Sequence, residues 1–320
     1  MIFMEVNKIP DKDWNVRLLS NVSGTFLQSK EFLQSEELCG NESLFINFMN
    51  NTGKIVGQIG IILYPLMKKK GKMGTILKKI PGIPTTLARW FYGPIIFDVN
   101  YTKEINDELR NFLIKKKFKV WGSEHPLSSG MLKNMKPFHS DVWGTFLIDL
   151  SQDKDVIWKS MDKHSARKNI ERSKSRNVIV KQMNKNDLGI LYELEISNGK
   201  IDDSTSLDMM EKQWDILQPA NYSGFIAYID DQPIGAMKFS TFNQYIIEFE
   251  VVRDKRDTEE KLYSQDNIKW KIIESGINNR LKFYDLSGVN PYPTTKKDLG
   301  IFHYKSKWGG KLIKYNILKS

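Results

Sequence analysis

The sequence has few of the residues from which metal sites and disulfides are made. Its 320 residues include a single cysteine, Cys39, so no internal disulfide can form, which is typical of a reducing cytoplasm. The four histidines, His125, His139, His164 and His303, stand at no metal-ligand spacing, and the chain has neither a P-loop nor a GxGxxG segment. We therefore expect no resident metal and no bound dinucleotide cofactor.

Long apolar runs are also lacking. Hydrophobic residues make up 40% of the chain, but no run approaches the ~18 residues that a helix needs to cross a bilayer. The first segment, MIFMEVNKIPDKDWN, has no basic region followed by a sustained apolar stretch, so it does not resemble a signal peptide. These absences predict a globular protein of the cytoplasm without a transmembrane segment.

Basic residues, in contrast, are abundant and unevenly placed. Lys and Arg outnumber Asp and Glu by 48 to 38, and the segment from Lys54 to Phe97 holds eight basic residues and no acidic one. A second concentration runs from Lys154 to Arg176. The distribution predicts a polyanionic partner: a tRNA, a phosphorylated or nucleotide-linked substrate, or an anionic membrane surface. The alternative is that runs such as KKKGK, residues 68–72, only keep a hairpin tip solvated.

Two stretches of the chain repeat one pattern. FINFMNNTGKIVGQI, residues 45–59, and FIAYIDDQPIGAMK, residues 225–238, each predict a β-hairpin with a turn rich in Asn or Asp. Residues 106–126 and 267–288 each predict an amphipathic helix followed by a short hydrophobic strand. The chain therefore has two halves of similar order, in agreement with a length suited to two domains.

The boundary between the halves is expected near residues 136–155, where the strand TFLIDL ends and Ser151 or Asp153 can begin a helix. We assign an N-terminal domain to residues 1–145 and a C-terminal domain to residues 146–320, whose last strand can return to the first domain. The predicted fold class is α/β of the α+β kind, with mixed, largely antiparallel sheets flanked by helices.

Residues 155–176 predict a single helix that starts acidic and ends basic, as the helix dipole favours. Lys163 and Arg167 are candidate phosphate ligands, and Asn177 can end the helix in a left-handed conformation. The alternative is a solvated surface helix. In either case an inward stripe is expected, which consists of Ile157, Met161, Ala166, Ile170 and Ser173.

The same residues resemble a known family. Lys163, Arg167, Asn169 and Ile170, followed by Val178, resemble the K-x-x-x-R-x-N-I…G-V segment of the FemABX family of peptidoglycan-bridge aminoacyltransferases. FLQSKEFLQSEELCG near the start, WFYGPII at residues 90–96 and YDLSGV…GIFHYKSKWGG near the end are similar to three further segments of that family, so the likeness spans essentially the whole chain.

The resemblance implies two GNAT-like domains in tandem, with acyl-donor chemistry in the second and the acceptor handled by the first. It implies transfer of an aminoacyl group from aminoacyl-tRNA, or another polyanionic donor, to an amine such as that of a peptidoglycan precursor peptide, with possible contact to a membrane surface and no cofactor. The segment between the strands VIVKQ and SGFIAYI is too short for a long helical hairpin, which is typical of the arm-less, FemX-type subgroup.

The resemblance also implies roles for single residues. Lys305, expected on a returning strand IFHYKSKWGG, corresponds to a cation that faces the developing oxyanion; the alternative is a surface lysine. Tyr92 and Tyr304 are candidate substrate contacts or core residues, and Asp285 is a further candidate that can instead cap the turn after its strand. Lys200 falls near a phosphate-binding arginine of the subgroup.

One departure concerns the acceptor. Glu36 stands where the family usually has a phosphate-binding lysine, and a carboxylate cannot take over that role. The identity of the acceptor therefore stays open at this point.

Two other functions remain open from the sequence. An acyl-CoA-dependent N-acyltransferase would need a glycine-rich pyrophosphate loop, whereas the corresponding segment RDKRDTEEKLYSQDN has no glycine and two successive glutamates. A non-catalytic protein that binds RNA or an anionic surface would keep the basic charge without the chemistry.

Overall fold

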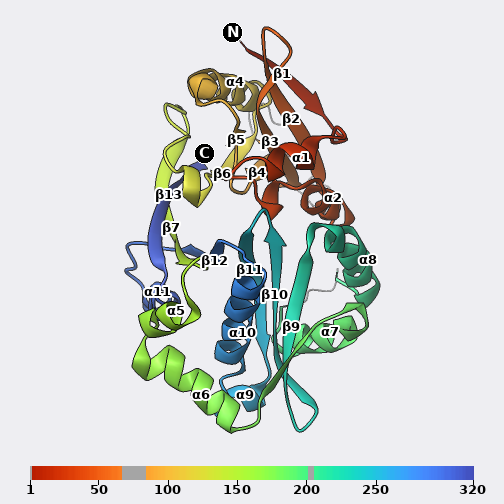
Figure 1. Ribbon diagram of the computed structural model, residues 1–320. Helices are drawn as coiled ribbons and strands as arrows, with labels where there is room; N and C mark the ends of the chain where they lie inside the picture. The colour runs from red at the N-terminus through yellow and green to blue at the C-terminus, as the bar shows by residue number, and fades with distance from the viewer. Residues whose placement is uncertain (1, 67–83, 201–204) are drawn as a thin grey trace. The chain divides into compact units, whose positions relative to one another are not determined.

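The computed structural model describes residues 2–66, 84–200 and 205–320 (Figure 1). The lysine run at residues 68–79 lies outside the described residues. The chain divides into two compact units, one of Met1–Trp143 with Lys314–Ser320 and one of Gly144–Ile313. Within the described ranges, no helix has the length and apolar character required to span a membrane.

The first unit is a mixed sheet with helices on both faces. Its strand order is β1-β2-β3-β4-β6-β13, in which β4 and β6 run parallel and the other neighbours antiparallel, while the short β5 pairs with β3. The elements are β1 (Ile2–Asn7), α1 (Trp14–Leu19), α2 (Lys30–Leu38), β2 (Glu42–Asn50), β3 (Ile55–Pro65), β4 (Thr86–Trp90), β5 (Ile95–Ile96), α4 (Thr102–Lys115), β6 (Lys119–Ser123) and β13 (Lys311–Lys319).

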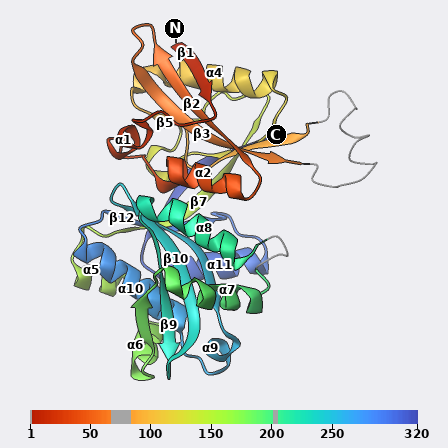
Figure 2. The same ribbon diagram turned by 90° about the vertical axis from the view of Figure 1, so that its right-hand side faces the viewer.

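Two glycines of β3 let helices approach the sheet closely from opposite faces. A Cβ on Gly57 would lie 2.8 Å from the side chain of Ile105 in α4, and one on Gly60 would lie 2.2 Å from Leu33 in α2. Because side chains alternate along a strand, positions three apart face opposite sides of the sheet. Figure 2 shows α4 on one face and α2 on the other.

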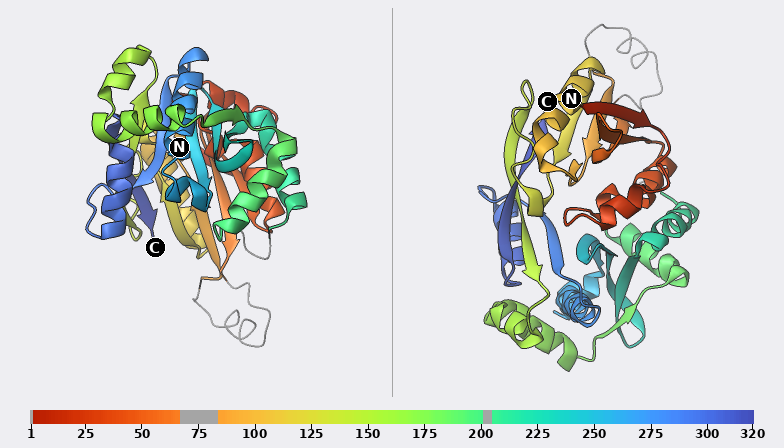
Figure 3. Two further views of the ribbon diagram at one scale, coloured as in Figure 1. Left: turned by 90° about the horizontal axis from the view of Figure 1, so that it is seen from below. Right: turned by 45° about the horizontal axis from the view of Figure 1, so that its top comes forward.

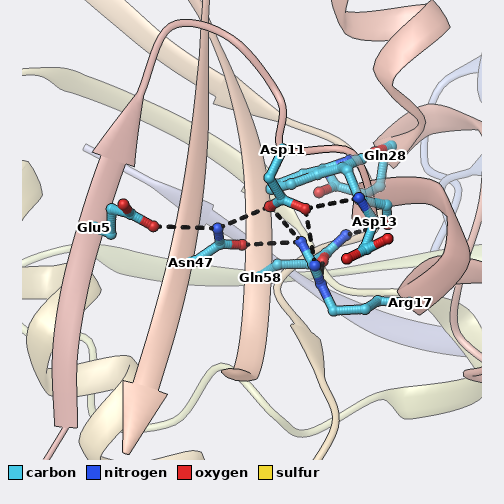
Figure 4. Close-up of polar contacts among 8 residues, drawn as sticks. Glu5, Asp11, Asp13, Arg17, Gln28, Asn47 and Gln58 are labelled. Atoms are coloured by element: carbon cyan, nitrogen blue, oxygen red, sulfur yellow. Dashed lines mark hydrogen bonds and ion pairs between the residues drawn. The ribbon is translucent and has the colours of Figure 1, made fainter. Parts of the chain in front are cut away.

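A polar network joins the first helices of this unit to the sheet (Figure 4). Arg17 makes two hydrogen bonds of 2.9 and 2.6 Å to Asp11 and one of 2.7 Å to Gln58, and Asn47 donates to Asp11 at 3.0 Å. Gln28 accepts from the Gly60 N–H at 2.7 Å. Buried polar groups are thus paired, which fixes the position of the α1–α2 region.

The second unit has the same kind of sheet. Its strand order is β7-β12-β11-β10-β9-β8, with β11 and β12 parallel and the other neighbours antiparallel. The elements are β7 (His139–Asp149), α5 (Lys154–Ser160), α6 (Lys168–Ser175), β8 (Ile179–Gln182), α7 (Leu188–Ser197), α8 (Leu207–Leu217), β9 (Tyr222–Ile229), β10 (Gln232–Phe242), β11 (Tyr245–Arg253), α9 (Lys255–Glu259), α10 (Ser264–Asn278), β12 (Phe283–Val289) and α11 (Lys296–Ser306).

Alternation along β9 produces two cores in the second unit. Phe225 and Ala227 face the core that contains α10, whereas Ile226 faces the core that contains α7 and α8. Figure 3 shows these helix groups around the sheet. Asp230 and Asp231 both have positive φ, 49° and 58°, as a two-residue turn between β9 and β10 requires.

The internal repeat is confirmed, and it includes an exchange of strands. The hairpin β2–β3 corresponds to β9–β10, and α4–β6 corresponds to α10–β12. However, the strand that follows β6, β7, pairs with β12, whereas the strand that follows β12, β13, pairs with β6. Each sheet therefore ends on a strand supplied by the other half of the sequence. The predicted fold class, with two mixed and largely antiparallel sheets flanked by helices, is confirmed.

The predicted continuous helix over residues 155–176 is wrong. α5 ends at Ser160, Met161 is extended with ψ 149°, and a wide turn at Lys163–Arg167 leads into α6. The Asp162 carboxylate accepts the His164 and Ser165 N–H groups at 3.0 and 2.7 Å, which starts a new helix. The inward stripe is nevertheless buried as predicted, and Asn177 ends α6 with φ 58°.

The predicted strand over IFHYKSKWGG is also wrong. Residues up to Ser306 form the end of α11, and β13 begins only at Lys311. Thr295 caps this helix by accepting the Asp298 N–H at 3.1 Å. The aromatic residues favoured a strand, but the cap and the helical spacing of the segment determine the structure.

Candidate active site

Lys305 lies in the last turn of α11 and reaches β12. Its ammonium donates to the backbone oxygens of Ser287 and Gly288 at 3.1 and 3.0 Å. The register between β12 and β7 shifts between Asp285 and Gly288, and Ser287 has φ 62°, so these two carbonyls lie at a bulge. Of three ammonium protons, two are used, and no third acceptor occurs among the residues that the structure describes.

Asp285 holds this bulge in place. Its fully buried carboxylate accepts the Ser287 N–H at 2.7 Å, the Tyr245 hydroxyl at 2.7 Å and the Thr145 hydroxyl. The Ser287 hydroxyl in turn donates to the backbone oxygen of Glu248 in β11 at 2.6 Å. The sequence had suggested either a substrate contact or a turn cap for Asp285, and the structure shows the cap.

The bulge lies where two parallel strands part. β11 and β12 pair over only three positions, from Tyr245 with Phe283 to Ile247 with Asp285, although both strands continue beyond. Ser287 therefore follows the last paired residue of β12 by two positions. The ammonium of Lys305 is thus hydrogen-bonded to the part of β12 that no longer pairs with β11.

The surroundings of Lys305 lower the pKa of its ammonium. Burial is the largest cause of the lower pKa, and the positive charge of Lys269 lowers it further. The negative charges of Glu248 and Asp285 raise it and so oppose this effect. A half-buried amine with this balance of charges is a common feature of functional sites, although structural ion pairs produce it too.

A buried ion pair lies next to this lysine, and sequence reasoning missed it. Lys269 of α10 is completely buried and pairs with Glu248, which also accepts the Tyr284 hydroxyl at 2.8 Å. The Lys269 ammonium lies 5.5 Å from the ring centres of both Tyr304 and Trp308. A lysine on the apolar face of α10, between Ile268 and Trp270, was the available signal in the sequence.

A second pair connects the C-terminal motif to the basic segment. Lys307 pairs with Asp266 of α10, and its ammonium lies 4.5 Å from the ring centre of Tyr304. Burial raises the pKa of Asp266, and Lys307 and the side chain of Asn169 beside it act in the opposite direction. The two motifs that resemble the family thus meet around α10, although they are more than a hundred residues apart in the chain.

Tyr304 lies within this cluster. Its hydroxyl is buried and has no hydrogen-bond partner within the described part of the chain, and burial raises the pKa of the phenol well above its usual value. Its ring centre lies 5.5 Å from the ammonium of Lys269 and 4.5 Å from that of Lys307. Tyr304 directly precedes Lys305 in the sequence. Its side chain nevertheless lies near Lys269 and Lys307 and not at the β12 bulge that Lys305 contacts.

Lys163 and Arg167 lie on the wide turn before α6. Lys163 is exposed, whereas Arg167 is half-buried, and its Nε is buried with no hydrogen-bond partner in the described ranges. Neither residue forms an ion pair with a described carboxylate. Neither cation is therefore neutralised by a described acidic side chain, which is compatible with their predicted role as phosphate ligands.

Lys200 lies apart from this cluster. It pairs with Glu250 at 3.6 Å, donates to the Val251 carbonyl and lines a cavity of about 190 Å³ between α7, α8 and the sheet. Lys238 in the same cavity is half-buried and pairs with Glu195, at 2.6 Å, and with Glu250, at 3.3 Å. Lys200 is already engaged by protein groups, and its predicted phosphate contact stays a prediction.

Tyr92 belongs to the first unit. It is buried, and its ring packs edge to face against His125 and Tyr315, with ring centres 5.1 and 5.7 Å away. Tyr92 is thus a core residue in this structure, and its predicted substrate contact is not tested by these contacts.

Glu36 lies in α2 of the same unit. Its carboxylate accepts the Tyr64 hydroxyl at 2.9 Å and the Asn41 amide at 3.0 Å.

The start of α10 is occupied by a carboxylate. Asp257 in α9 is buried and accepts the Ser264 N–H, the first amide of α10, at 2.8 Å. Burial raises the pKa of Asp257, and the bonds from Ser264 oppose that effect. A free helix N-terminus can bind a phosphate, but here the carboxylate of Asp257 lies where a phosphate would bind. Across the described residues, no group of His, Cys, Asp and Glu is arranged to hold a metal ion.

Three solved structures are similar to the chain over nearly their whole length. The structure of FemX has a TM-score of 0.70 at 12% identity and covers 98% of this chain and 96% of its own. The C-terminal domain of a putative lysylphosphatidylglycerol synthetase from Agrobacterium fabrum has a TM-score of 0.58 at 8% identity, over 95% and 92%. A tandem GNAT protein from the clavulanic acid biosynthesis pathway has a TM-score of 0.53 at 10% identity, over 100% and 97%.

No protein-family profile and no curated protein matches the sequence. At identities of 8 to 12%, the structural likeness establishes the fold alone. The chain has the fold of FemX and of tandem GNAT proteins, so the resemblance to the FemABX family is confirmed at the level of the fold.

Proposed function

We propose that the protein is an acyltransferase that forms an amide bond, with an aminoacyl-tRNA as donor and an amine-bearing molecule, such as a cell-wall precursor peptide, as acceptor. The observation that carries the proposal is the ammonium of Lys305, held by two carbonyl oxygens at the β12 bulge. In this proposal the second unit handles the acyl donor and the first unit the acceptor.

The chemistry places one demand on the protein. The acceptor amine attacks the ester carbonyl, a tetrahedral oxyanion forms, and the bond to the ribose oxygen breaks while a proton passes from the amine to that oxygen. A cation that is already fixed in position stabilises the oxyanion without reorganisation. Lys305 has its third ammonium proton available for this, and Asp285 keeps the bulge that orients it. No metal or cofactor takes part in these steps.

Two observations favour a tRNA donor over acyl-CoA. Arg167 and Lys163 are cations without a described counter-ion, and they lie on the segment whose Asn169 contacts Asp266, the partner of Lys307. Asp257 occupies the helix N-terminus that a CoA pyrophosphate would need. The net charge of +10 suits a polyanionic donor such as RNA, and it also suits contact with an anionic membrane surface.

The acceptor is less restricted by the structure. Glu36 is held by Tyr64 and Asn41, so α2 presents a carboxylate in place of a phosphate-binding cation. The amine of a precursor peptide, free or attached to a lipid, remains the proposed nucleophile. The names of two similar structures, FemX and lysylphosphatidylglycerol synthetase, support an aminoacyl-transfer activity.

The proposal is tested by incubating the protein with a pool of charged tRNAs, or separately with acyl-CoA thioesters, and a panel of amine acceptors with and without anionic vesicles. Products are identified by mass spectrometry. We expect new amides whose formation stops after ribonuclease treatment. Release of CoA with activity unaffected by ribonuclease would instead establish an acyl-CoA enzyme. Binding of RNA without any amide product would establish a non-catalytic role.

A further inference from the structure

The first unit contains an arginine that lies close to three aromatic rings. Arg89 lies in β4, in register with Ile62 of β3 and Trp121 of β6. Its guanidinium carbon lies 4.5 Å from the ring centre of Phe91, 4.6 Å from that of Trp121 and 5.8 Å from that of Tyr64. We call Tyr64, Arg89, Phe91 and Trp121 the Arg89 patch; all four are half-buried.

Two of these rings also contact each other. Phe91 and Trp121 pack edge to face, with ring centres 5.5 Å apart, so Arg89 lies over the pair rather than between two parallel rings. Such cation–π contacts hold the plane of the guanidinium at little cost in side-chain entropy. A fixed fork of N–H donors suits bidentate binding of a carboxylate or phosphate.

The charge of Arg89 has no counter-ion in the described structure. No described carboxylate lies within ion-pair distance, and its Nε is buried without a hydrogen-bond acceptor among the described residues. The acid beyond Tyr64, Glu36, already accepts from Tyr64 and Asn41. A guanidinium stays protonated at all physiological pH values, and a buried donor without an acceptor destabilises the fold, so the patch is expected to gain from an added anion.

We propose that the Arg89 patch is a binding site for an anionic oxygen group, a carboxylate or a phosphate, carried next to a flat or apolar moiety that contacts Phe91 and Trp121. The assignment of this ligand to the acceptor rests on the proposed function, because the first unit is the proposed acceptor side. Binding itself does not depend on any transfer reaction. The patch would then select acceptors by an acidic group rather than by their amine alone.

Three small probes test the site without donor or catalysis. Phenyl phosphate and phenylacetate carry the two anionic groups on the same ring, and phenylacetamide is the neutral control. The indole N–H resonance of Trp121, assigned by its loss in Trp121→Phe, reports binding by NMR. We expect a saturable shift with at least one anionic probe and none with phenylacetamide; which of the two binds more tightly identifies the group.

Variants at Arg89 separate the proposed role from packing. Arg89→Gln should lower the affinity for the probe by about 10- to 100-fold, as expected for loss of a hydrogen-bonded charge. Arg89→Lys should give an intermediate loss of affinity, because the charge stays but the two parallel N–H donors of the guanidinium are lost. Arg110→Gln is the matched control, because Arg110 is a surface arginine of the same unit that pairs with Asp107 at 2.9 Å. It should bind the probe like the parent protein.

Three results would overturn the proposal: no saturable shift with either anion, equal binding of phenylacetamide, or equal binding by Arg89→Gln. If Arg89→Gln fails to fold, Arg89→Lys and the salt dependence of probe binding decide in its place. Failure to detect aminoacyl transfer would leave these outcomes unchanged, so the two proposals stand or fall separately.

Discussion

At the scale of single residues, the second unit uses two lysines in different ways. Lys269 is completely buried, paired with Glu248 and contacted by aromatic rings, so its charge is committed to the fold. Lys305 is held only by backbone oxygens and keeps part of its surface accessible. A charge held by neutral dipoles can interact with a new anion, whereas a charge held by a carboxylate is largely neutralised.

The first prediction concerns the ammonium of Lys305. Lys305→Ala should lower the turnover of the proposed transfer by about 10² to 10³, the usual effect of removing a preorganised oxyanion donor. Single-turnover kinetics with charged tRNA measure it. Lys297→Ala, an exposed lysine on the same helix, should retain full turnover. Normal turnover of Lys305→Ala would remove this residue from the mechanism.

The second prediction concerns pH. Burial lowers the pKa of Lys305, so its proton is lost at a pH below the usual lysine value of 10.5. If the protonated amine is required, turnover falls as pH rises through this lowered pKa. Lys305→Arg keeps its charge and should lose this alkaline decline while it retains partial turnover. An identical alkaline limb in both proteins, after correction for donor hydrolysis, would contradict the assignment.

The third prediction concerns His125 and stability. Burial lowers the pKa of His125 to about 3, whereas an unfolded chain binds this proton near pH 6.5. Between these values the unfolded state binds more protons, so the free energy of unfolding falls as pH falls, by up to about 1.4 kcal/mol per pH unit from this group.

The test compares three proteins. His125→Asn, which keeps an acceptor for the Leu127 N–H, should show a shallower acid limb in urea titrations between pH 6.5 and 3 than the parent protein. His139→Asn, at an exposed histidine, should follow the parent curve. Parallel curves for His125→Asn and the parent would show that His125 titrates normally.

At the scale of elements, local patterns predicted most helices and strands but not their limits. Period-2 and period-3.6 patterns correctly indicated β2–β3, β9–β10, α4 and α10. The break at Met161 depends on Asp162, whose side chain competes with a continuous helix by binding the N–H groups that follow it. α11 was missed because two prolines precede it and aromatic residues fill it, although Thr295 and Asp298 have the spacing of a helix cap.

The candidate site was predicted only in part for a similar reason. Lys305 was found by resemblance, and its neighbourhood consists of residues brought together by the fold, such as Glu248 and Lys269. A buried charge can be recognised in a sequence only where it interrupts an apolar face. The partner residue that neutralises the charge cannot be recognised in this way.

The fourth prediction concerns two glycines, one shortly after α11 and one inside it. Gly309 has φ 74°, and a Cβ there would lie 2.3 to 2.7 Å from Ser160 at the end of α5. Gly309→Ala should therefore lower the free energy of unfolding by roughly 1–3 kcal/mol. Gly300→Ala is the matched control: it lies inside α11, where a Cβ has no atom within 4 Å, and should raise stability by roughly 0.5–1 kcal/mol. Equal effects of both changes would contradict the close approach at Gly309.

At the scale of the whole molecule, the return of the last strand to the first domain was expected from the sequence, whereas the strand with which β13 pairs and the pairing of β7 with β12 were not predicted. A strand has the same alternation whichever neighbour it pairs with, so its pattern does not identify its partner. The structure shows that Ile317 of β13 pairs with Ser123, and that the Glu124 carboxylate accepts the Asn316 N–H at 3.0 Å.

The fifth prediction concerns these exchanged residues. Deletion of residues 314–320 removes the buried side chains of Tyr315, Ile317 and Leu318, each worth roughly 1.5–3 kcal/mol of burial. Amide hydrogen exchange in β6 should become faster, while β9 and β10 keep their protection. Lys319→Ala, which removes only an exposed ion pair with Asp141, should leave β6 protected. Unchanged exchange in β6 after the deletion would contradict the strand pairing.

The exchange of strands also determines when the first unit can complete its sheet during translation. The first unit acquires its last strand only after the whole second unit has left the ribosome, because residues 144–313 precede Lys314 in the chain. At about 5–20 residues per second, the roughly 170 intervening residues take on the order of 10 to 30 s. During that interval the strand edge of β6 is unpaired, so the nascent chain must protect it or expose it to chaperones.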